Sequence, residues 1–342
     1  MDRPRRRSRF LSEPSRTVLV TPLLGSHLPR ELVARIEAVD GVRVARIAAD
    51  GQIHGDASES AFEAAEVMLL GSVPPTVLDH IVSRSPRLRW IHSASAGVDR
   101  IATPAVLERK LIVTNARGVF SRPIAEYVVM MALAIARRLP QLLELQRERT
   151  WQPLRGREMS ELTIGIVGYG SIGREVAGLL APFGCRIVAT RRHPERGAGE
   201  GVEIELYGLD RLGDVLAESD IVVVAAPLTD ETAGLIGAEQ LGQMREDAWL
   251  INIARGRLVD ELALRRALEA GWIGGAVLDV FNEEPLPADS PLYGTPNVVV
   301  TPHTSWASDR VVERSVELFI DNLRRDASGE PLRNVVNLDA GY

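Results

Sequence analysis

The chain has 342 residues, of which 45% are hydrophobic and 25% are charged. This length and composition predict a globular protein with two cores, because a single core seldom grows to this size. With 40 basic against 46 acidic residues, the net charge is -6, which disfavours a general binder of nucleic acid or of anionic membranes. We therefore expect small solutes as partners, and neither a nucleic-acid nor a membrane partner.

The chain carries one cysteine, Cys185, so it can form neither an intrachain disulfide nor a cysteine-rich metal site. We expect no bound metal and a reducing, cytoplasmic compartment. The longest apolar stretch, residues 127–136, is about half of the roughly 20 residues that a membrane-spanning helix requires. Residues 1–16 are rich in arginine and lack the apolar run of a signal peptide, so we expect a disordered arm.

Short apolar runs alternate with helical patterns along the chain, which predicts parallel sheets covered by helices on both faces. In the first part of the chain we expect a helix at 31–39 and strands at 18–20, 42–47, 67–70, 88–92 and 111–114. These elements predict one α/β layer before residue 118. A helix over 124–138 is hydrophobic around most of its circumference, so we expect it to be buried between domains or subunits.

The strongest local pattern opens the second layer. An apolar strand at 163–167 leads into the sequence GYGSIG, then into a helix with Ile172, Val176, Leu179 and Phe183 on one face, and a strand at 186–190 follows. The first glycine permits a tight turn, the second lets the backbone approach a pyrophosphate, and the third allows close packing of the helix on the strand. The expected cofactor-binding residues of this loop are Gly168, Gly170, Ser171, Ile172 and Gly173. The alternative is a glycine-rich packing turn without a ligand.

The second strand of this βαβ unit ends in Thr190, Arg191 and Arg192, where NAD-binding sites usually carry an acidic residue. A hydroxyl and two guanidinium groups suit the 2′-phosphate of NADP(H), which a carboxylate would repel. We therefore expect a preference for NADP(H). The alternative is that both arginines are solvated surface charges and that the protein uses NAD(H) or both cofactors.

Three further strands end in residues that carry chemistry. A strand at 249–253 precedes Arg255, a strand at 275–278 precedes Asp279 and Glu284, and a strand at 298–301 precedes His303. Since ligands bind at the carboxyl ends of parallel strands, we expect these groups to converge. An arginine can clamp a carboxylate, a histidine can transfer a proton near neutral pH, and a carboxylate can orient the histidine. The set predicts hydride transfer to a 2-oxo acid, although each residue taken alone could be structural.

The order of these motifs resembles the D-isomer-specific 2-hydroxyacid dehydrogenases over nearly the whole chain. The matching segments are SAGVD at 95–99, NARG at 115–118, AE at 125–126, GIVGYGSIG at 165–173, PLTDET at 227–232, NIARGRLVD at 252–260, LDVF at 278–281, EP at 284–285 and TPH at 301–303. In lacking an acidic residue that could bind the ribose, the chain resembles the NADP-using glyoxylate and hydroxypyruvate reductases of that family. The resemblance implies NAD(P)H-dependent conversion of a small 2-oxo acid to the D-2-hydroxy acid.

The resemblance also implies roles for individual residues. It makes Arg255 the substrate-holding group, His303 the acid/base and Glu284 its carboxylate partner. The implied substrate-binding backbone is at Ala96, Gly97 and Val98, and the further cofactor-binding residues are Pro227, Thr232, Ala254 and Asp279. Trp306 either walls the substrate pocket or is an ordinary packing tryptophan.

The family's architecture implies two Rossmann-like or flavodoxin-like domains, with the cofactor domain inserted into a discontinuous substrate domain. We place the dinucleotide-binding domain at 119–305 and the substrate domain at 17–118 plus 306–342, with a closing helix at 311–324. The family implies a homodimer, for which the helix at 124–138 is a candidate interface. A second function remains open, a dinucleotide-sensing binding protein similar to a corepressor of this fold, because retained catalytic residues do not exclude it.

Overall fold

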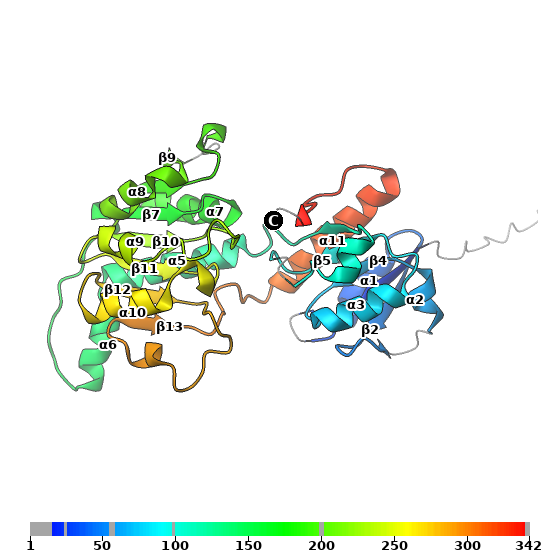
Figure 1. The fold of residues 1–342 in the computed structure, drawn as a ribbon, viewed down its shortest axis with the longest axis horizontal. Coiled ribbons are helices and arrows are strands. Elements are labelled where there is room, and N and C mark those ends of the chain that lie inside the picture. Colours follow the sequence, from blue (N-terminus) through cyan, green and yellow to red (C-terminus); the bar gives the residue numbers. More distant parts are fainter. Residues whose placement is uncertain (1–15, 24–25, 55–58, 98–99, 198–201, 339–342) are drawn as a thin grey trace, which may run out of the picture. The chain divides into compact units, whose positions relative to one another are not determined.

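The computed structural model describes residues 16–23, 26–54, 59–97, 100–197 and 202–338 (Figure 1). The chain divides into two compact units, one made of Met1–Val119 and Asp309–Tyr342, and one made of Phe120–Ser308. The expected arm at 1–16 lies outside the described residues except for Arg16, the first residue of a strand. Each unit has its own sheet.

The first unit contains a six-stranded sheet of order β3-β2-β1-β4-β5-β6, parallel except at its edge strand β3. Its strands are β1 (Arg16–Val20), β2 (Val42–Ile47), β3 (Ile53–His54), β4 (Ala65–Leu70), β5 (Trp90–Ser93) and β6 (Ile112–Thr114). Without β3, this is the order of flavodoxin-like folds. The sequence did not predict β3, because two residues are too few to show an alternating pattern.

Helices cover both faces of this sheet. They are α1 (Arg30–Glu37), α2 (Ser60–Ala64), α3 (Pro75–Arg84), α4 (Pro104–Glu108) and α11 (Val311–Ser328). Successive strand residues point to opposite faces, so in β1 Leu19 packs in the core formed with α2, α3 and α4, whereas Val18 and Val20 pack in the core formed with α1 and α11. The helix after residue 310 therefore completes the core that the first strands begin.

The second unit contains a seven-stranded sheet in which every pair of strands is parallel. In spatial order its strands are β13 (Val298–Val300), β12 (Gly275–Leu278), β11 (Trp249–Asn252), β10 (Ile221–Val224), β7 (Thr163–Val167), β8 (Arg186–Thr190) and β9 (Glu205–Tyr207). The strand order reverses between β7 and β10, as in Rossmann folds, and ligands bind at that reversal. The expected fold class, two α/β units with parallel sheets, is confirmed.

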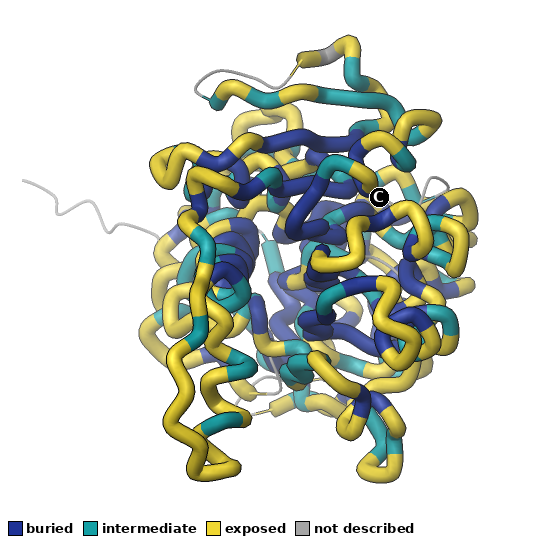
Figure 2. Tube along the Cα trace, turned by 90° about the vertical axis from the view of Figure 1, so that its left-hand side faces the viewer, coloured by how far each residue is buried: buried dark blue, intermediate teal, exposed yellow. Residues whose placement is uncertain are grey.

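The helices of the second unit are α5 (Ser121–Ala136), α6 (Leu139–Arg147), α7 (Ser171–Leu180), α8 (Leu212–Glu218), α9 (Ala238–Gln243) and α10 (Glu261–Glu269). Single 3-10 turns lie at Met159–Glu161, Ala181–Phe183, Pro194–Arg196, Leu209–Arg211, Gly256–Leu258 and Pro291–Gly294. One buried cluster joins α8, α9 and α10 to the sheet, and α5 packs against α7. Buried residues gather in the strands, while exposed residues dominate the helix surfaces and loops (Figure 2).

The buried face of α7 differs from the expected one. Its buried residues are Gly173, Val176, Ala177 and Leu180, whereas Ile172 and Leu179 are half-buried and Phe183 is exposed in the following turn. The helix is thus rotated so that small residues face the sheet, which permits the close approach that Gly173 provides. Counting only large apolar residues missed this face.

The helix expected at 124–138 is partly buried within the single chain, and its expected burial between domains or subunits stays a prediction. In α5, the face that includes Tyr127 and Val128 is buried, but Met130 is 52% exposed, and Arg122 and Glu126 form an ion pair on the surface. Packing against α7 covers one side of the helix only. Its other apolar residues remain accessible.

A histidine lies in the core of the first unit. The ring of His92, in β5, is fully buried, and its Nδ1 lies 2.7 Å from Oγ1 of Thr114, which also accepts a hydrogen bond of 2.9 Å from Nε1 of Trp90. The Phe319 ring of α11 lies 5.4 Å from the imidazole. Burial lowers the pKa of His92 to about 3, so the folded protein keeps this ring neutral.

We predict that acid destabilises the protein through His92. An unfolded histidine binds a proton near pH 6.5, whereas folded His92 does so only near pH 3, so stability present above pH 6.5 is lost as the pH falls. At pH 5.5 the loss is about 1.4 kcal/mol of unfolding free energy. Urea unfolding of the full chain at pH 7.5 and 5.5 measures it, and His92→Gln should remove this part of the pH dependence. Equal pH shifts in wild type and variant would contradict the assignment.

Candidate active site

Three neighbouring strands of the second unit end in the residues expected to carry chemistry. Arg255 follows β11, Glu284 follows β12, and His303 follows β13. These strands are adjacent and parallel, so their carboxyl ends share one edge of the sheet. Neighbouring strands lie about 5 Å apart, which gives a span that one small substrate can bridge.

The side chains of His303 and Glu284 are hydrogen-bonded at this edge. Nδ1 of His303 lies 2.7 Å from Oε2 of Glu284, and Oε1 of Glu284 accepts a hydrogen bond of 3.0 Å from the backbone N–H of Phe281. An ionised carboxylate only accepts hydrogen bonds, so the proton of the pair lies on Nδ1. That leaves Nε2 as the ring nitrogen that can exchange a proton with a substrate. The two side chains are 39% and 36% exposed, so solvent reaches them.

The segment that carries Arg255 is held by its own backbone. Nη1 of Arg255 donates to the carbonyl of Ala254 at 2.7 Å, while the buried amide of Asn252 donates to the Arg255 carbonyl and accepts from the Ala254 N–H. A β-carbon on Gly256 would collide with the backbone of Phe281. The close approach at Gly256 therefore packs the Arg255 segment against the one that leads to Glu284.

Asp279, the first residue after β12, has no exposed surface. Its carboxylate accepts hydrogen bonds from the hydroxyl of Thr301 and from the backbone N–H groups of Thr304 and Ser305. These hydrogen bonds hold the segment on either side of His303. The resemblance implies that Asp279 contacts the nicotinamide carboxamide, and this role stays a prediction.

The glycine loop after β7 has the form that a dinucleotide requires. Gly168 has φ +104°, and a β-carbon there would collide with the backbone of Ala226. A β-carbon on Gly173 would meet the carbonyl of Gly168 at 2.6 Å, so the first turn of α7 packs directly on the loop. A β-carbon on Gly170 would meet nothing within 4 Å. The loop thus combines a required tight turn with open space at its middle glycine, and this fits a pyrophosphate at the start of α7.

The remaining loop residues of the expected cofactor site lie around this turn. Ser171 and Ile172 form the first turn of α7, exposed and half-buried respectively, and Ala254 is buried after β11. Pro227 follows β10, and its carbonyl accepts a hydrogen bond of 2.6 Å from the hydroxyl of the buried Thr232. Strand β10 lies between β7 and β11, so the turn from Pro227 to Thr232 borders the place where the strand order reverses.

The end of β8 differs from the expected arrangement at Thr190. This residue is fully buried, and its carbonyl and hydroxyl accept hydrogen bonds from the backbone N–H of Gly168. The hydroxyl of Thr190 therefore binds the backbone of the glycine loop and is not exposed to a phosphate. Arg191 donates to the carbonyl of Gly197 at 2.8 Å, and the exposed Arg192 forms an ion pair with Glu231.

Two of the three residues expected to bind a substrate carboxylate are described. Ala96 and Gly97 follow β5 in the first unit, where the Ala96 carbonyl accepts a hydrogen bond of 2.8 Å from the amide of Asn115. Val98 lies outside the described residues. Their role in binding a substrate stays a prediction.

Trp306 is half-buried, three residues after His303. Its ring packs edge-on against Phe120 at the start of α5, with 6.2 Å between the ring centroids. This contact gives Trp306 a packing role, and it leaves the choice between packing and a pocket wall open.

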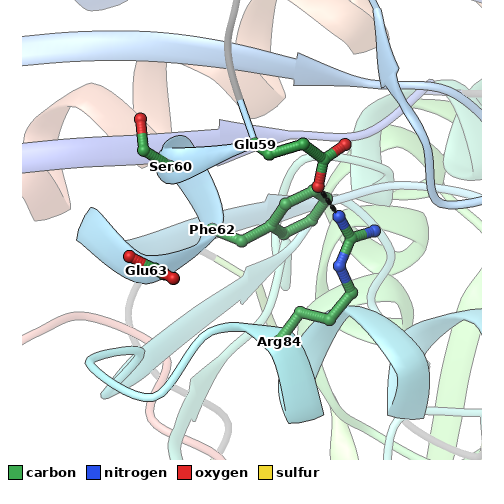
Figure 3. Close-up of a pocket in the computed structure, with 5 residues that line it drawn as sticks. All are labelled: Glu59, Ser60, Phe62, Glu63 and Arg84. Carbon is green, nitrogen blue, oxygen red and sulfur yellow. Dashed lines mark hydrogen bonds and ion pairs between the residues drawn. The ribbon is translucent and has the colours of Figure 1, made fainter.

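A pocket in the first unit carries no comparable chemistry. It is lined by Glu59, Ser60, Phe62, Glu63 and Arg84 (Figure 3). The guanidinium of Arg84 lies 3.8 Å from the centre of the Phe62 ring and forms an ion pair with Glu59, so its charge is already partnered. Among the described residues, no group of three or more His, Cys, Asp or Glu side chains could hold a metal ion. No described helix has both the length and the apolar character to cross a bilayer.

A family model and the relatives of known function point to the same family. Residues 129–305 match the family model of the D-isomer specific 2-hydroxyacid dehydrogenase, NAD binding domain. A glyoxylate/hydroxypyruvate reductase B of Pectobacterium carotovorum is 40% identical over 78% of this chain and 83% of its own length. A glyoxylate reductase of Korarchaeum cryptofilum is 36% identical over 75% of this chain and 78% of its own length.

Solved structures agree with the sequence comparison. A D-isomer specific 2-hydroxyacid dehydrogenase from Xanthobacter autotrophicus, in complex with NADPH and MES, superimposes with a TM-score of 0.82 at 33% identity. The match covers 95% of this chain and 99% of that protein. It therefore spans both units.

We predict that His303→Ala lowers kcat for 2-oxo acid reduction by about a hundredfold or more, because a positioned acid contributes roughly 10²–10⁴-fold to a rate. Cofactor affinity should stay within about twofold, since His303 and the glycine loop follow different strands of the sheet. Absorbance of the reduced cofactor at 340 nm measures turnover, and quenching of protein fluorescence measures cofactor binding. A variant that retains near wild-type kcat would refute the acid/base role.

Proposed function

The chain belongs to the D-isomer specific 2-hydroxyacid dehydrogenase family, an NAD(P)-dependent class of oxidoreductases, and we propose that it reduces a small 2-oxo acid of the glyoxylate or hydroxypyruvate type. We propose NADPH as the preferred hydride donor, the D-2-hydroxy acid as product and the cytoplasm as the compartment. The observation that carries the proposal is the hydrogen bond between His303 and Glu284, which follow β13 and β12, the two strands next in order to the strand β11 that Arg255 follows.

The proposed mechanism assigns one task to each side chain. The nicotinamide ring, when bound, supplies the hydride. The guanidinium of Arg255 binds the substrate carboxylate and draws electron density from the neighbouring carbonyl. Nε2 of His303 gives its proton to the carbonyl oxygen as carbon accepts the hydride, so the C=O bond becomes CH–OH. Glu284, hydrogen-bonded to Nδ1 of His303, keeps the ring in the required orientation.

The proposed cofactor preference rests on the exposed arginine after β8. The ion pair of Arg192 with Glu231 joins side chains that are 40% and 71% exposed, and such pairs contribute little to stability. A 2′-phosphate can therefore replace Glu231 as the partner of Arg192 at small cost, and a guanidinium binds phosphate by charge-assisted hydrogen bonds. The similar Xanthobacter autotrophicus dehydrogenase was crystallised with NADPH.

A panel of 2-oxo acids assayed with NADPH and NADH tests this proposal. We expect turnover with glyoxylate and hydroxypyruvate, and a lower KM for NADPH than for NADH. In Arg191→Ala/Arg192→Ala, KM for NADPH should rise about tenfold or more while KM for NADH changes little, because only NADPH carries the phosphate. The matched control is Arg324→Ala, an exposed arginine of α11 in the other unit.

Two results would count against the proposal. Equal losses for the two cofactors would refute the phosphate contact while leaving the reaction intact. Tight cofactor binding without turnover of any 2-oxo acid would instead favour a dinucleotide-sensing binding protein.

We also propose that the protein is a homodimer that uses α6 and its flanks. None of the nine residues of α6 is buried, yet Leu139, Leu142 and Leu143 share one face and are 38–45% exposed. Met130 of α5 is 52% exposed, and the Trp151 side chain, after α6, is fully exposed. Exposed apolar side chains that share a helix face, as the three leucines do, mark interaction surfaces. A second copy of the chain is the occupant that the family relationship favours.

We predict that Leu142→Lys/Leu143→Lys shifts the protein from dimer to monomer, because two ammonium groups would be desolvated in the interface. Sedimentation velocity at micromolar concentration measures the mass. Glu148→Lys, which adds positive charge just after α6 and away from the leucine face, should leave the dimer intact. A monomeric wild type at that concentration, or an unaffected double variant, would contradict the proposal.

A further inference from the structure

His303 has a backbone conformation that needs support. Its φ is +49°, in the left-handed region that side chains with a β-carbon seldom adopt, and the cost there is on the order of 1 kcal/mol. Its own N–H donates to the carbonyl of Thr301 at 3.0 Å. The imidazole direction therefore depends on how firmly the surrounding residues fix this turn.

The carboxylate of Asp279 fixes the turn from both sides. Oδ1 accepts from the hydroxyl of Thr301 at 2.6 Å and from the N–H of Thr304 at 2.9 Å, and Oδ2 accepts from the N–H of Ser305 at 2.9 Å. Two of these donors are backbone groups that cannot act as acceptors. The Thr301 hydroxyl donates its single proton to this carboxylate.

The direction of this hydrogen bond fixes the role of a side chain on a helix far away in the sequence. The hydroxyl of Tyr127, in α5, lies 2.7 Å from Oγ1 of Thr301. Because the Thr301 proton is committed to Asp279, its oxygen can only accept, so Tyr127 must donate. Burial raises the pKa of Tyr127 to about 12, so the phenol keeps the proton that it donates. The three groups form a one-way chain of hydrogen bonds, in which each bond strengthens the next.

We propose that Tyr127 is a positioning residue for His303, acting through Thr301 and Asp279 on the turn that presents the imidazole. The hydroxyl of Tyr127 is hydrogen-bonded to Thr301, which lies two residues before His303. The expected effect on kcat rests on the proposed function, whereas the expected effect on the orientation of the His303 ring rests on the geometry alone. The two can therefore be tested separately.

The structural test uses NMR of the full chain with labelled histidine, in which loss of a signal in His303→Ala assigns the imidazole Cε1–H of His303. Tyr127→Phe removes one oxygen, and we expect it to shift or broaden that signal. Tyr293→Phe, at an exposed tyrosine of the turn Pro291–Gly294, is the matched control and should leave the signal unchanged. An unchanged His303 signal in Tyr127→Phe would overturn the proposal, whether or not the protein reduces 2-oxo acids.

The kinetic test is a double-mutant cycle. Tyr127→Phe should lower kcat about tenfold with little change in the KM for NADPH, since loss of one net hydrogen bond is worth roughly that factor. Thr301→Val should lower kcat at least as much, and Thr301→Ser, which keeps the hydroxyl, should restore it.

Adding Tyr127→Phe to Thr301→Val should cause no further loss, because Tyr127 acts through Thr301. Fully additive losses would show that Tyr127 acts by another route and would overturn the proposal. If Thr301→Val does not fold, the NMR signal of Tyr127→Phe decides alone. A wild type without turnover would refute the proposed function and leave the NMR result standing.

Discussion

Three hydrogen-bond donors converge on the buried carboxylate of Asp279, one from the hydroxyl of Thr301 and two from the backbone at Thr304 and Ser305. A buried carboxylate without such donors would cost several kcal/mol, so the burial of Asp279 and the shape of this turn stabilise each other. His303 lies inside the turn, and its hydrogen bond with Glu284 depends on the same backbone. The candidate site is therefore fixed from within the second unit.

The order of the strands explains why groups distant in sequence meet at this place. Strands β11, β12 and β13 are parallel neighbours, so the residues after them share an edge whatever the lengths of the helices between. The close packing of Gly256 on the segment after β12 then sets the distance between two of these loops. The parallel strand order thus brings the three loops to one edge, and the missing side chain of Gly256 lets two of them lie in direct contact.

Much of this arrangement could be predicted from the sequence, because its causes are local. The tight turn at Gly168 and the close packing at Gly173 follow from the absence of a side chain, and the structure has both. Buried apolar runs predicted five strands of each sheet but missed β3, β9 and β10, and the polar residues after three of the predicted strands indicated one edge. The family relationship inferred from the same motifs is confirmed by the comparisons.

The errors share a physical cause, which is that side-chain partners across the fold do not follow from chain order. Thr190 looked available to a phosphate, yet its hydroxyl is buried beneath Gly168. Tyr127 read as one apolar residue in an apolar helix, yet its hydroxyl begins the chain of hydrogen bonds that ends at Asp279. A tyrosine amid aliphatic residues is a signal in itself, because a buried phenol needs a hydrogen-bond partner. That partner proved to be Thr301, two residues before His303.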